Sequence, residues 1–406
     1  MPEAVIVSAA RSPIGRAFKG SLKDVRPDDL TAHIIATALA KVPQLDPRDI
    51  DDLMLGCGLP GGEQGHNLAR IIAVQMGMDY LPGTTITRYC SSSLQTTRMA
   101  LHAIKAGEGD VFISAGVETV SRSINGTSDG LPGTQNPLFD EAVARTAKRA
   151  EEGGGEWHDP RADGLLPDAY IAMGQTAENL AALKGVTRAD QDEFGVRSQN
   201  LAEAAIKAGF WEREITPVTT PDGTVVSKDD GPRADVTLEA VSGLKPVFRP
   251  DGTVTAGNCC PLNDGAAALV IMSDTKAREL GITPLARVVS TGVTGLSPEI
   301  MGLGPVEASR QALKRAGLTI DDIDLVEINE AFAAQVIPSY RDLGIDIDKL
   351  NVNGGAIAVG HPFGMTGARL TTTLINSLQF HDKQFGLETM CVGGGQGMAM
   401  VIERLS

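Results

Sequence analysis

The chain has 406 residues, of which 42% are hydrophobic, so it can form more than one domain with its own core. Its formal net charge is −15 without a basic stripe, and only 4% of its residues are aromatic. This composition argues against nucleic acid and anionic membrane surfaces as partners, because both require clustered positive charge and single-stranded nucleic acid also requires stacking rings.

The five cysteines are odd in number and include no C-x-x-C pair. They argue against a disulfide framework or a zinc site and indicate a reducing compartment. The N-terminus runs directly into a strand pattern instead of a signal peptide, and no stretch reaches the ~20 apolar residues of a membrane span. We therefore expect a cytoplasmic protein without a metal and without a membrane segment.

The N-terminal part alternates between strand and helix patterns. We expect strands at residues 4–10, 84–87 and 110–116, a helix-to-strand approach at residues 49–56, and helices at residues 28–40, 67–77 and 94–104. Asp28 or Asp29 is the expected N-cap of the first helix. This alternation is typical of an α/β unit with a mostly parallel sheet.

Cys90 stands between the strand at residues 84–87 and the helix at residues 94–104, followed by three serines that favour a helix N-terminus. The positive end of a helix stabilises a thiolate, so we expect a lowered pKa and a candidate nucleophile. Taken alone, Cys90 fits a small buried apolar residue at least as well, since most free cysteines are buried.

The C-terminal part repeats the same order. Residues 322–329 correspond to residues 49–56, and the turn at residues 360–367 falls where the Cys90 turn falls. A helix at residues 368–378 and a strand at residues 387–393 follow. We infer a duplicated α/β unit, whose two copies can bring equivalent turns together at one site when they pack face to face.

Between the two copies lies a region rich in glycine, proline and charged residues. It contains two helix patterns, at residues 173–183 and 188–208, and an expected exposed loop tip at residues 151–155. Long irregular segments in compact proteins usually serve binding, so we expect an ordered insertion that covers a site rather than a solvated excursion. The predicted domains are an N-terminal half (residues 1–120, completed by about 257–282), the insertion (121–256) and a C-terminal half (283–406).

Four clusters carry candidate catalytic groups: Cys90, Asn329 in N-E-A-F, His361 in G-H-P, and Cys391 with the glycines that follow it. Each has a simple structural interpretation, such as a helix cap, a turn histidine or a core cysteine. Together they stand at matching turns of a duplicated unit and form a complete set for acyl transfer. Cys90 is the expected nucleophile, His361 its base and Cys391 a second acid and base.

Two groups remain for stabilising negative charge. Asn329 can hold a water or donate to an oxyanion, and the glycine run from Gly393 exposes backbone N–H groups suited to a second oxyanion hole. Two acid/base groups and two oxyanion sites exceed what a hydrolase needs. They fit a Claisen condensation or its reverse.

The chain resembles the thiolase family along essentially its whole length. The resemblance rests on the Cys90 turn, N-E-A-F at residues 329–332, G-H-P at residues 360–362 and Cys391 with its glycines. It also rests on M-G-Q-T-A-E-N at residues 173–179, T-V-T-A-G-N at residues 253–258 and N-D-G-A-A at residues 263–267. The resemblance implies a duplicated thiolase fold, a layered α-β-α-β-α core with an inserted loop domain, and a homodimer or homotetramer.

By this resemblance, Cys90 becomes acylated, His361 activates it and helps bind the thioester oxygen, and Asn329 acts through a water. Cys391 moves the proton on the α-carbon of acetyl-CoA, and the N–H groups of Cys90 and Gly393 form the second oxyanion hole. The resemblance implies reversible cleavage of 3-ketoacyl-CoA by CoA in fatty acid β-oxidation, possible hydratase and dehydrogenase partners, and no permanently bound cofactor.

The resemblance also implies the residues that contact substrate. The CoA contacts would be Arg233, Phe248, Ala256, Cys260, Leu262 and Phe332, and the acyl pocket would be lined by Met173 and Met301.

Several positions depart from the family pattern. Cys260 and Pro261 replace a serine and a glycine common beside pantetheine, Ser93 replaces a glycine, and Met365 stands where a smaller residue is frequent. Ala172 replaces the histidine typical of short-chain biosynthetic members. A small apolar residue there favours a degradative enzyme that accepts longer chains.

The alternative functions would differ from this one either in a single residue of the site or in whether the protein converts its ligand. One alternative is a biosynthetic acetoacetyl-CoA thiolase, and another is an acyl-CoA-binding protein without turnover. The four filled catalytic positions argue against the binding protein. A decarboxylating ketosynthase would use a second histidine where this chain has Cys391.

Overall fold

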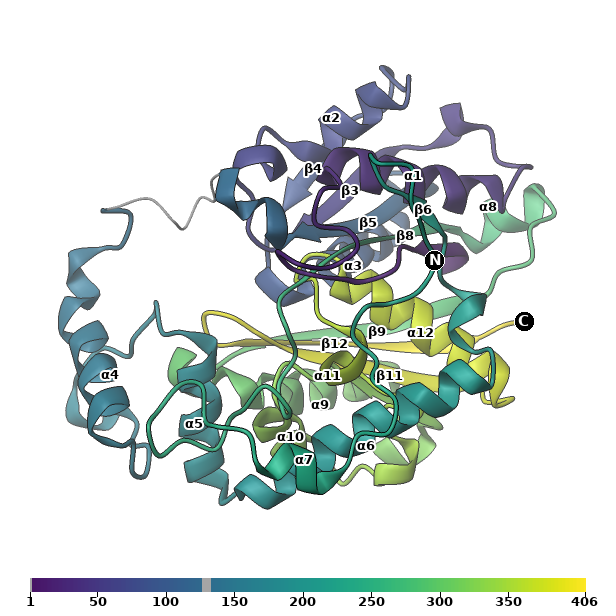
Figure 1. The fold of residues 1–406 in the computed structure, drawn as a ribbon. Helices are drawn as coiled ribbons and strands as arrows, with labels where there is room; N and C mark the ends of the chain where they lie inside the picture. The colour runs from purple at the N-terminus through teal and green to yellow at the C-terminus, as the bar shows by residue number, and fades with distance from the viewer. Residues whose placement is uncertain (1, 126–132) are drawn as a thin grey trace.

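The computed structural model describes residues 2–125 and 133–406, so residues 126–132 of the predicted insertion lie outside the described part. Two α/β halves are stacked one above the other (Figure 1). Their strands form one continuous sheet in the order β10-β11-β12-β9-β1-β8-β5-β3-β4, with the short β2 paired to β8. The halves join where β1 and β9 pair over Val5–Arg287 and Ile6–Ala286.

The N-terminal half contributes one arm of this sheet. Its strands are β1 (Ala4–Arg11), β2 (Gly15–Arg16), β3 (Asp52–Cys57), β4 (Gly83–Ile86), β5 (Val111–Thr119) and β8 (Asn263–Ser273). Its helices are α1 (Pro27–Ala40), α2 (Leu68–Gln75), α3 (Ser92–Ala106) and α8 (Asp274–Glu279).

The C-terminal half contributes the other arm. Its strands are β9 (Ala286–Gly295), β10 (Leu325–Ile328), β11 (Phe385–Val392) and β12 (Gln396–Arg404). Its helices are α9 (Gly304–Ala316), α10 (Ala333–Leu343), α11 (Ala356–Val359) and α12 (Thr366–Phe380).

Three apolar cores separate the layers. The central core includes Leu94 and Leu101 of α3 and Leu370 and Leu374 of α12, which pack between the inner faces of the two arms. A second core covers the outer face of the N-terminal arm with α1 and α2. A third covers the outer face of the C-terminal arm with α9 and α10. The layering is therefore α-β-α-β-α, with α3 and α12 in the middle (Figure 1).

The expectation of a mostly parallel sheet is wrong. β3 pairs in parallel with β4 and β5, and β10 with β11. The pairs β1–β8, β5–β8, β11–β12 and β9–β12 are antiparallel. A tight return at residues 393–395 joins β11 to β12, and such short connections can link only antiparallel strands.

Most of the insertion lies along one side of the stack and under the C-terminal half, and its strand Val218–Thr219 lies beside α1 of the N-terminal half (Figure 1). It contains α4 (Asp140–Glu152), α5 (Met173–Lys184), α6 (Arg188–Lys207), α7 (Leu238–Ser242) and the hairpin β6 (Val218–Thr219) and β7 (Val225–Val226). The sequence prediction missed α4. The predicted cap of α1 is also wrong, because Arg26 is the N-cap and makes no side-chain capping bond.

Within the described residues, no helix combines the length and the apolar character that crossing a lipid bilayer requires.

Candidate active site

Cys90 lies in a short 3-10 turn, Tyr89–Ser91, directly before α3. Ser92 Oγ accepts a hydrogen bond from the Arg88 N–H (2.9 Å) and donates one to the Tyr89 carbonyl (2.7 Å). Tyr89 takes a positive φ of 42°, which is uncommon for a residue with a side chain. This tight turn leaves the Cys90 side chain buried at the junction of the two halves.

The expected low pKa of Cys90 is wrong. Burial raises the pKa of the thiol to about 12, and the Gly393 backbone N–H that contacts the sulfur offsets only part of this effect. The nearby Glu118 carboxylate raises the pKa further. Cys90 therefore rests as a neutral thiol and requires a base before it can attack a carbonyl.

His361 is oriented by Thr366. The Thr366 hydroxyl donates its only proton to the Pro362 carbonyl (2.7 Å) and lies 2.6 Å from His361 Nδ1. It must therefore accept a hydrogen bond from Nδ1–H, which leaves Nε2 of the neutral ring unprotonated. His361 Nε2 faces the Asn329 side-chain amide at 3.3 Å. The nitrogen that can take a proton thus lies beside the group expected to stabilise an oxyanion.

The histidine is also held neutral. Burial, and secondarily the positive charge of Arg369, lower the pKa of His361 to about 3. The backbone N–H of His361 donates to Asn263 Oδ1 (2.9 Å), so β8 of the N-terminal half fixes the loop from the C-terminal half. The fixed imidazole therefore keeps a free Nε2 lone pair at neutral pH, the state in which a general base accepts a proton.

Cys391 and Gly393 lie at the end of β11, next to the Cys90 turn. Burial raises the pKa of Cys391, and proximity to Cys90 raises it further. Gly394 and Gly395 have φ values of 77° and 82°, which let the chain reverse into β12. The two cysteines, His361 and Asn329 therefore come from three separate loops and one strand end that the fold brings together.

A cavity of about 370 Å³ opens beside Cys90. Among the residues that the structure describes, its lining contains no charged side chain and consists of Leu59, Tyr89, Cys90, Thr134, Gln135, Ala169, Tyr170, Ile171, Met173, Phe363, Gly393 and Gly394. The Phe363 ring packs edge-on against His361, with 5.2 Å between ring centroids. The cavity is thus an apolar compartment that begins at the nucleophile and is walled by a residue touching the base.

The sequence analysis identified Met173 of this lining but missed Leu59, Tyr89, Tyr170 and Phe363. Two of these residues stand within motifs that the analysis singled out, since Tyr89 directly precedes Cys90 and Phe363 follows His361 by two positions. Their closeness to those motifs was the available signal. Leu59 and Tyr170 come from remote loops and carry no comparable signal.

Most of the predicted substrate contacts gather in one place. Met173, Phe248 and Cys260 pack against the third core, which includes Met301, Phe332 and Cys391. The Phe248 and Phe332 rings meet edge to face, 6.1 Å apart.

The remaining three predicted contacts are not members of this core. Ala256 and Leu262 are exposed, and Leu262 keeps half of its surface in solvent. Arg233 lines a separate cavity of about 680 Å³ beside Trp211 at the end of α6.

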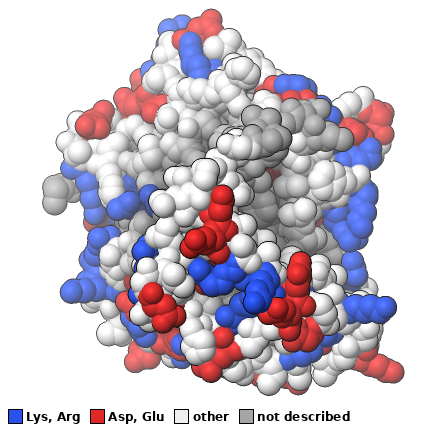
Figure 2. Space-filling view, turned by 90° about the vertical axis from the view of Figure 1, so that its left-hand side faces the viewer, with Lys and Arg blue, Asp and Glu red and all other residues white. Residues whose placement is uncertain are grey.

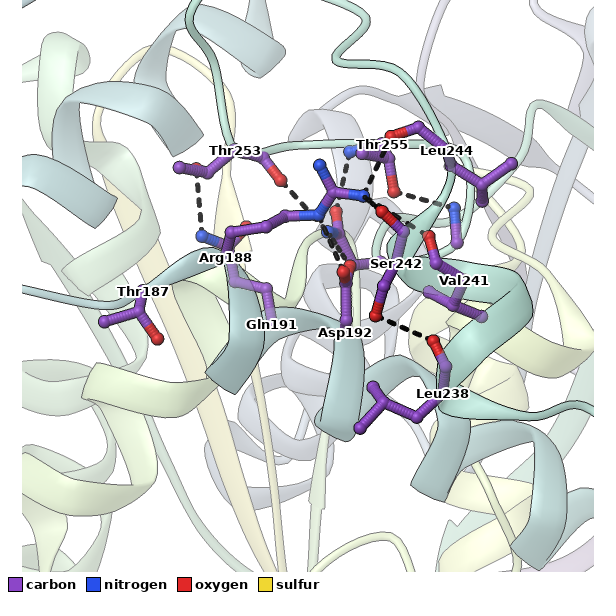
Figure 3. A network of polar contacts seen from close by, with 12 residues as sticks. Thr187, Arg188, Gln191, Asp192, Leu238, Val241, Ser242, Leu244, Thr253 and Thr255 are labelled. Atoms are coloured by element: carbon purple, nitrogen blue, oxygen red, sulfur yellow. Dashed lines mark hydrogen bonds and ion pairs between the residues drawn. The ribbon is translucent and has the colours of Figure 1, made fainter.

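A polar network holds the insertion segment that carries several of these residues (Figure 3). Arg188 of α6 donates to the carbonyls of Val241, Ser242 and Leu244 at the C-terminal end of α7 and pairs with Asp192 (2.7 Å). Asp192 accepts from Asn258 Nδ2 (2.8 Å), which continues the network to residues 253–258. The segment between α7 and Asn258, which includes Phe248 and Ala256, is thereby tied to α6 at both ends.

Glu118 is a buried carboxylate that the sequence analysis missed. It accepts hydrogen bonds from the N–H groups of Gly58 (2.7 Å), Leu59 (3.2 Å) and Gly364 (2.9 Å), and from Gln64 Nε2 (2.8 Å). It therefore ties the Leu59 wall of the cavity to the loop that carries His361. Its position at the end of the strand predicted at residues 110–116 was the only sequence signal.

Across residues 2–125 and 133–406, no three His, Cys, Asp or Glu side chains come together as a group that could hold a metal ion.

The chain matches two family models, the N-terminal thiolase domain over residues 4–275 and the C-terminal thiolase domain over residues 282–404. A 3-ketoacyl-CoA thiolase of Bacillus subtilis is 44% identical over 99% of this chain and 100% of the relative. One of Photobacterium profundum is 43% identical over the full length of both.

Solved structures agree with these matches. The acetyl-CoA acetyltransferase of Bacillus anthracis superposes with a TM-score of 0.86 at 40% identity, covering 100% of this chain and 99% of the other. The dimeric peroxisomal thiolase of Saccharomyces cerevisiae superposes with a TM-score of 0.88 at 35% identity, covering 99% and 98%.

The two family models, the full-length relatives and the matching fold define an acyltransferase. The chain belongs to the thiolase family.

Proposed function

We propose that the protein cleaves 3-ketoacyl-CoA with free CoA, giving acetyl-CoA and an acyl-CoA shortened by two carbons. The observation that carries this proposal is a neutral, oriented His361 packed against Phe363, which walls the apolar cavity that opens at Cys90, with Cys391 close to Cys90. The names of the full-length relatives support the same reaction.

In the first half-reaction, His361 Nε2 takes the proton of the Cys90 thiol, and the sulfur attacks the C3 carbonyl carbon of the substrate. The C2–C3 bond then breaks, and the acyl group remains on Cys90 as a thioester. The electron pair of that bond stays on C2 as the enolate of acetyl-CoA, and Cys391 delivers the proton that completes acetyl-CoA.

In the second half-reaction, a CoA thiol gives its proton to Cys391 and attacks the acyl carbon, and Cys90 leaves with the proton held by His361. Asn329 and His361 Nε2 are placed to stabilise one oxyanion, the first through a water. The N–H groups of Cys90 and Gly393 are placed for the other, since the Gly393 N–H contacts the Cys90 sulfur.

The acyl cavity supports substrates longer than acetoacetyl-CoA. The cavity of about 370 Å³ opens directly beside Cys90, so an acyl chain on this residue can extend into it. Its uncharged, largely apolar lining suits a hydrocarbon chain. The similarity to an acetyl-CoA acetyltransferase favours the alternative, biosynthetic synthesis of acetoacetyl-CoA.

We further propose a cytoplasmic homo-oligomer that acts in fatty acid β-oxidation. CoA and acyl-CoA bind as substrates, with no permanently bound cofactor, and the region of residues 121–256 covers the CoA site. A 3-ketoacyl-CoA substrate implies a hydratase and a dehydrogenase that supply it, because these reactions create the 3-keto group. The dimeric yeast structure supports the oligomer.

The testing experiment measures thiolysis against 3-ketoacyl-CoA chain length, from about four to sixteen carbons, with wild type and Cys90→Ala in parallel. We expect a maximum beyond four carbons and loss of turnover in the variant, since the nucleophile is removed. A sharp optimum at four carbons would support the biosynthetic enzyme. Absence of wild-type turnover at every length would contradict the proposed activity and support a binding protein.

A further inference from the structure

Arg369 is a fully buried arginine next to the proposed catalytic groups. It lies one turn into α12, with no exposed surface, and its Nη2 donates to Asn329 Oδ1 at 3.5 Å. Among the described residues, this is the only hydrogen bond of the guanidinium, and Nε and Nη1 are buried without a partner. A guanidinium stays charged in proteins, so this arrangement is costly unless it serves the site.

The contact with Arg369 determines how the Asn329 amide is oriented. Since His361 Nδ1 carries the ring proton, Nε2 offers a lone pair and needs a donor opposite it. The reversed amide would point its oxygen at that lone pair and its NH₂ group at the guanidinium, and both contacts would be repulsive. A guanidinium can only donate, so its contact with Oδ1 selects the orientation in which the NH₂ group faces His361.

We propose that Arg369 is a positioning residue, which fixes the Asn329 amide toward His361 and so builds the first oxyanion site. It does not touch the reacting atoms. Its effect reaches the substrate through Asn329, the residue expected to hold the water or donate to the thioester oxygen. This inference rests on the proposed roles of Asn329 and His361.

Arg369 also interacts electrostatically with the charged side chains around it. The guanidinium is attracted by three carboxylates, those of Glu327 on β10, Glu330 just after it and Glu214 before the β6–β7 hairpin. It is repelled by Arg11 on β1. Glu327 and Glu388 each have one carboxylate oxygen buried without a partner in the described chain. Burial lowers the pKa of His361 most, and among the described residues Arg369 is the charged group that lowers it further. Its removal should therefore leave the histidine more easily protonated.

The experiment is a double-mutant cycle on kcat for thiolysis, with Arg369→Met, Asn329→Ala and the double variant. Arg369→Met should lower kcat about 10- to 100-fold and change KM less than about threefold, because it disturbs the orientation of a catalytic group rather than substrate binding. In the Asn329→Ala background the same substitution should change kcat less than about twofold. The acid limb of the pH profile should move to higher pH in both variants that lack Arg369.

Arg197→Met is the matched control, because Arg197 is also partly buried, has an unpartnered Nη1 among the described residues and donates to the carbonyls of Ile347 and Leu350 instead of to Asn329. It should leave kcat within about twofold of wild type. If Arg369→Met does not fold, Arg369→Lys replaces it in the cycle, and its loss of kcat must likewise disappear in the Asn329→Ala background.

The inference would be overturned if the loss of kcat in the double variant equalled the product of the losses in the two single variants. It would also be overturned if a folded Arg369→Met or Arg369→Lys protein kept the kcat of wild type. These outcomes presuppose an active wild-type enzyme. An inactive wild type would instead count against the proposed function, so the two failures are distinguishable.

Discussion

His361 couples the chemistry of the site to the stability of the protein. Its pKa is lowered to about 3 by burial, and by Arg369, whereas an unfolded histidine titrates near its ordinary value of about 6.5. As the pH falls from about 6.5 toward 3, the unfolded chain takes up a proton that the folded protein refuses. The contribution of His361 to stability is therefore complete above pH 6.5 and declines below it.

The measurable consequence is a difference in the free energy of unfolding between pH 7.5 and pH 5.5. Wild type should lose about 1.4 kcal/mol more over this interval than His361→Asn, in which the titrating group is absent. Denaturant titrations at the two pH values measure the difference. The exposed His158→Asn variant is the control and should match wild type within about 0.5 kcal/mol. An equal loss in His361→Asn would show that His361 titrates normally in the folded protein.

For single residues, the sequence predicts which side chains are candidate catalytic groups better than it predicts their protonation states. Cys90, Asn329, His361 and Cys391 could be named because reactive residue types stood at matching turns. The state of Cys90 could not be predicted, since its pKa depends on burial by both halves and not on the local helix end. Glu118 and Arg369 were missed because their importance comes from partners far away in the sequence.

Among the helices, the short α7 is hydrogen-bonded to α6 through the Arg188 side chain. Arg188 Nη2 donates to three carbonyls at the end of α7, including that of Leu244 at 2.9 Å. Hydrogen bonds from charged groups contribute about 1.5–3 kcal/mol, so their loss should release the segment between α7 and Asn258. That segment includes Phe248 and Ala256, which are expected to contact CoA.

Arg188→Met should therefore raise KM for CoA about 5- to 10-fold and leave kcat within about twofold, because the acyl-transfer groups lie on other elements. Steady-state thiolysis with varied CoA measures both constants. Arg278→Met is the control, since Arg278 lies on α8 with 72% of its side chain exposed, and it should change neither constant. An Arg188→Met protein with an unaltered KM for CoA would show that this segment does not serve CoA binding.

Helices could be predicted where buried residues recur at helical spacing along the sequence. Helices α3, α5, α6 and α12 were expected close to their observed positions because each buries an apolar face. Helix α4 buries only Ala142 and is rich in charged residues, and the sequence analysis missed it although its polar and small residues recur with helical periodicity. The directions of the strands could not be derived from alternation alone, because antiparallel returns such as β11–β12 depend on the glycine turn between them.

In the whole molecule, the two halves meet where α3 and α12 begin. The Ala368 N–H in the first turn of α12 donates to Ser93 Oγ (2.8 Å), so a residue of one half satisfies a helix end of the other. Ser93 stands where the family usually has glycine, and this bond gives its hydroxyl a structural role. The duplication seen in the sequence predicted that the two turns would meet, but not this contact.

Gly367 permits the approach of the two helices. A Cβ atom at this position would lie 2.1 Å from the Leu94 backbone nitrogen and 2.8 Å from its Cα, and neither backbone atom can move without shifting α3. Gly367→Ala should therefore push the helices apart and lower the free energy of unfolding by about 3 kcal/mol or more. Activity should fall as well, because α3 follows Cys90 and α12 follows His361. Thermal and denaturant unfolding, with thiolysis on the same samples, measure both effects.

Gly243→Ala provides the matched comparison. Gly243 has a φ of −76°, and the nearest atom to an added Cβ is the Ala240 carbonyl oxygen at 3.8 Å. A methyl group there meets no obstacle and restricts the unfolded chain, so stability should stay equal or rise by about 0.4–1 kcal/mol. Equal stability of the Gly367→Ala and Gly243→Ala proteins would mean that the halves tolerate a wider separation. The active site would then not depend on close contact between α3 and α12, since Cys90 and His361 would keep their alignment without it.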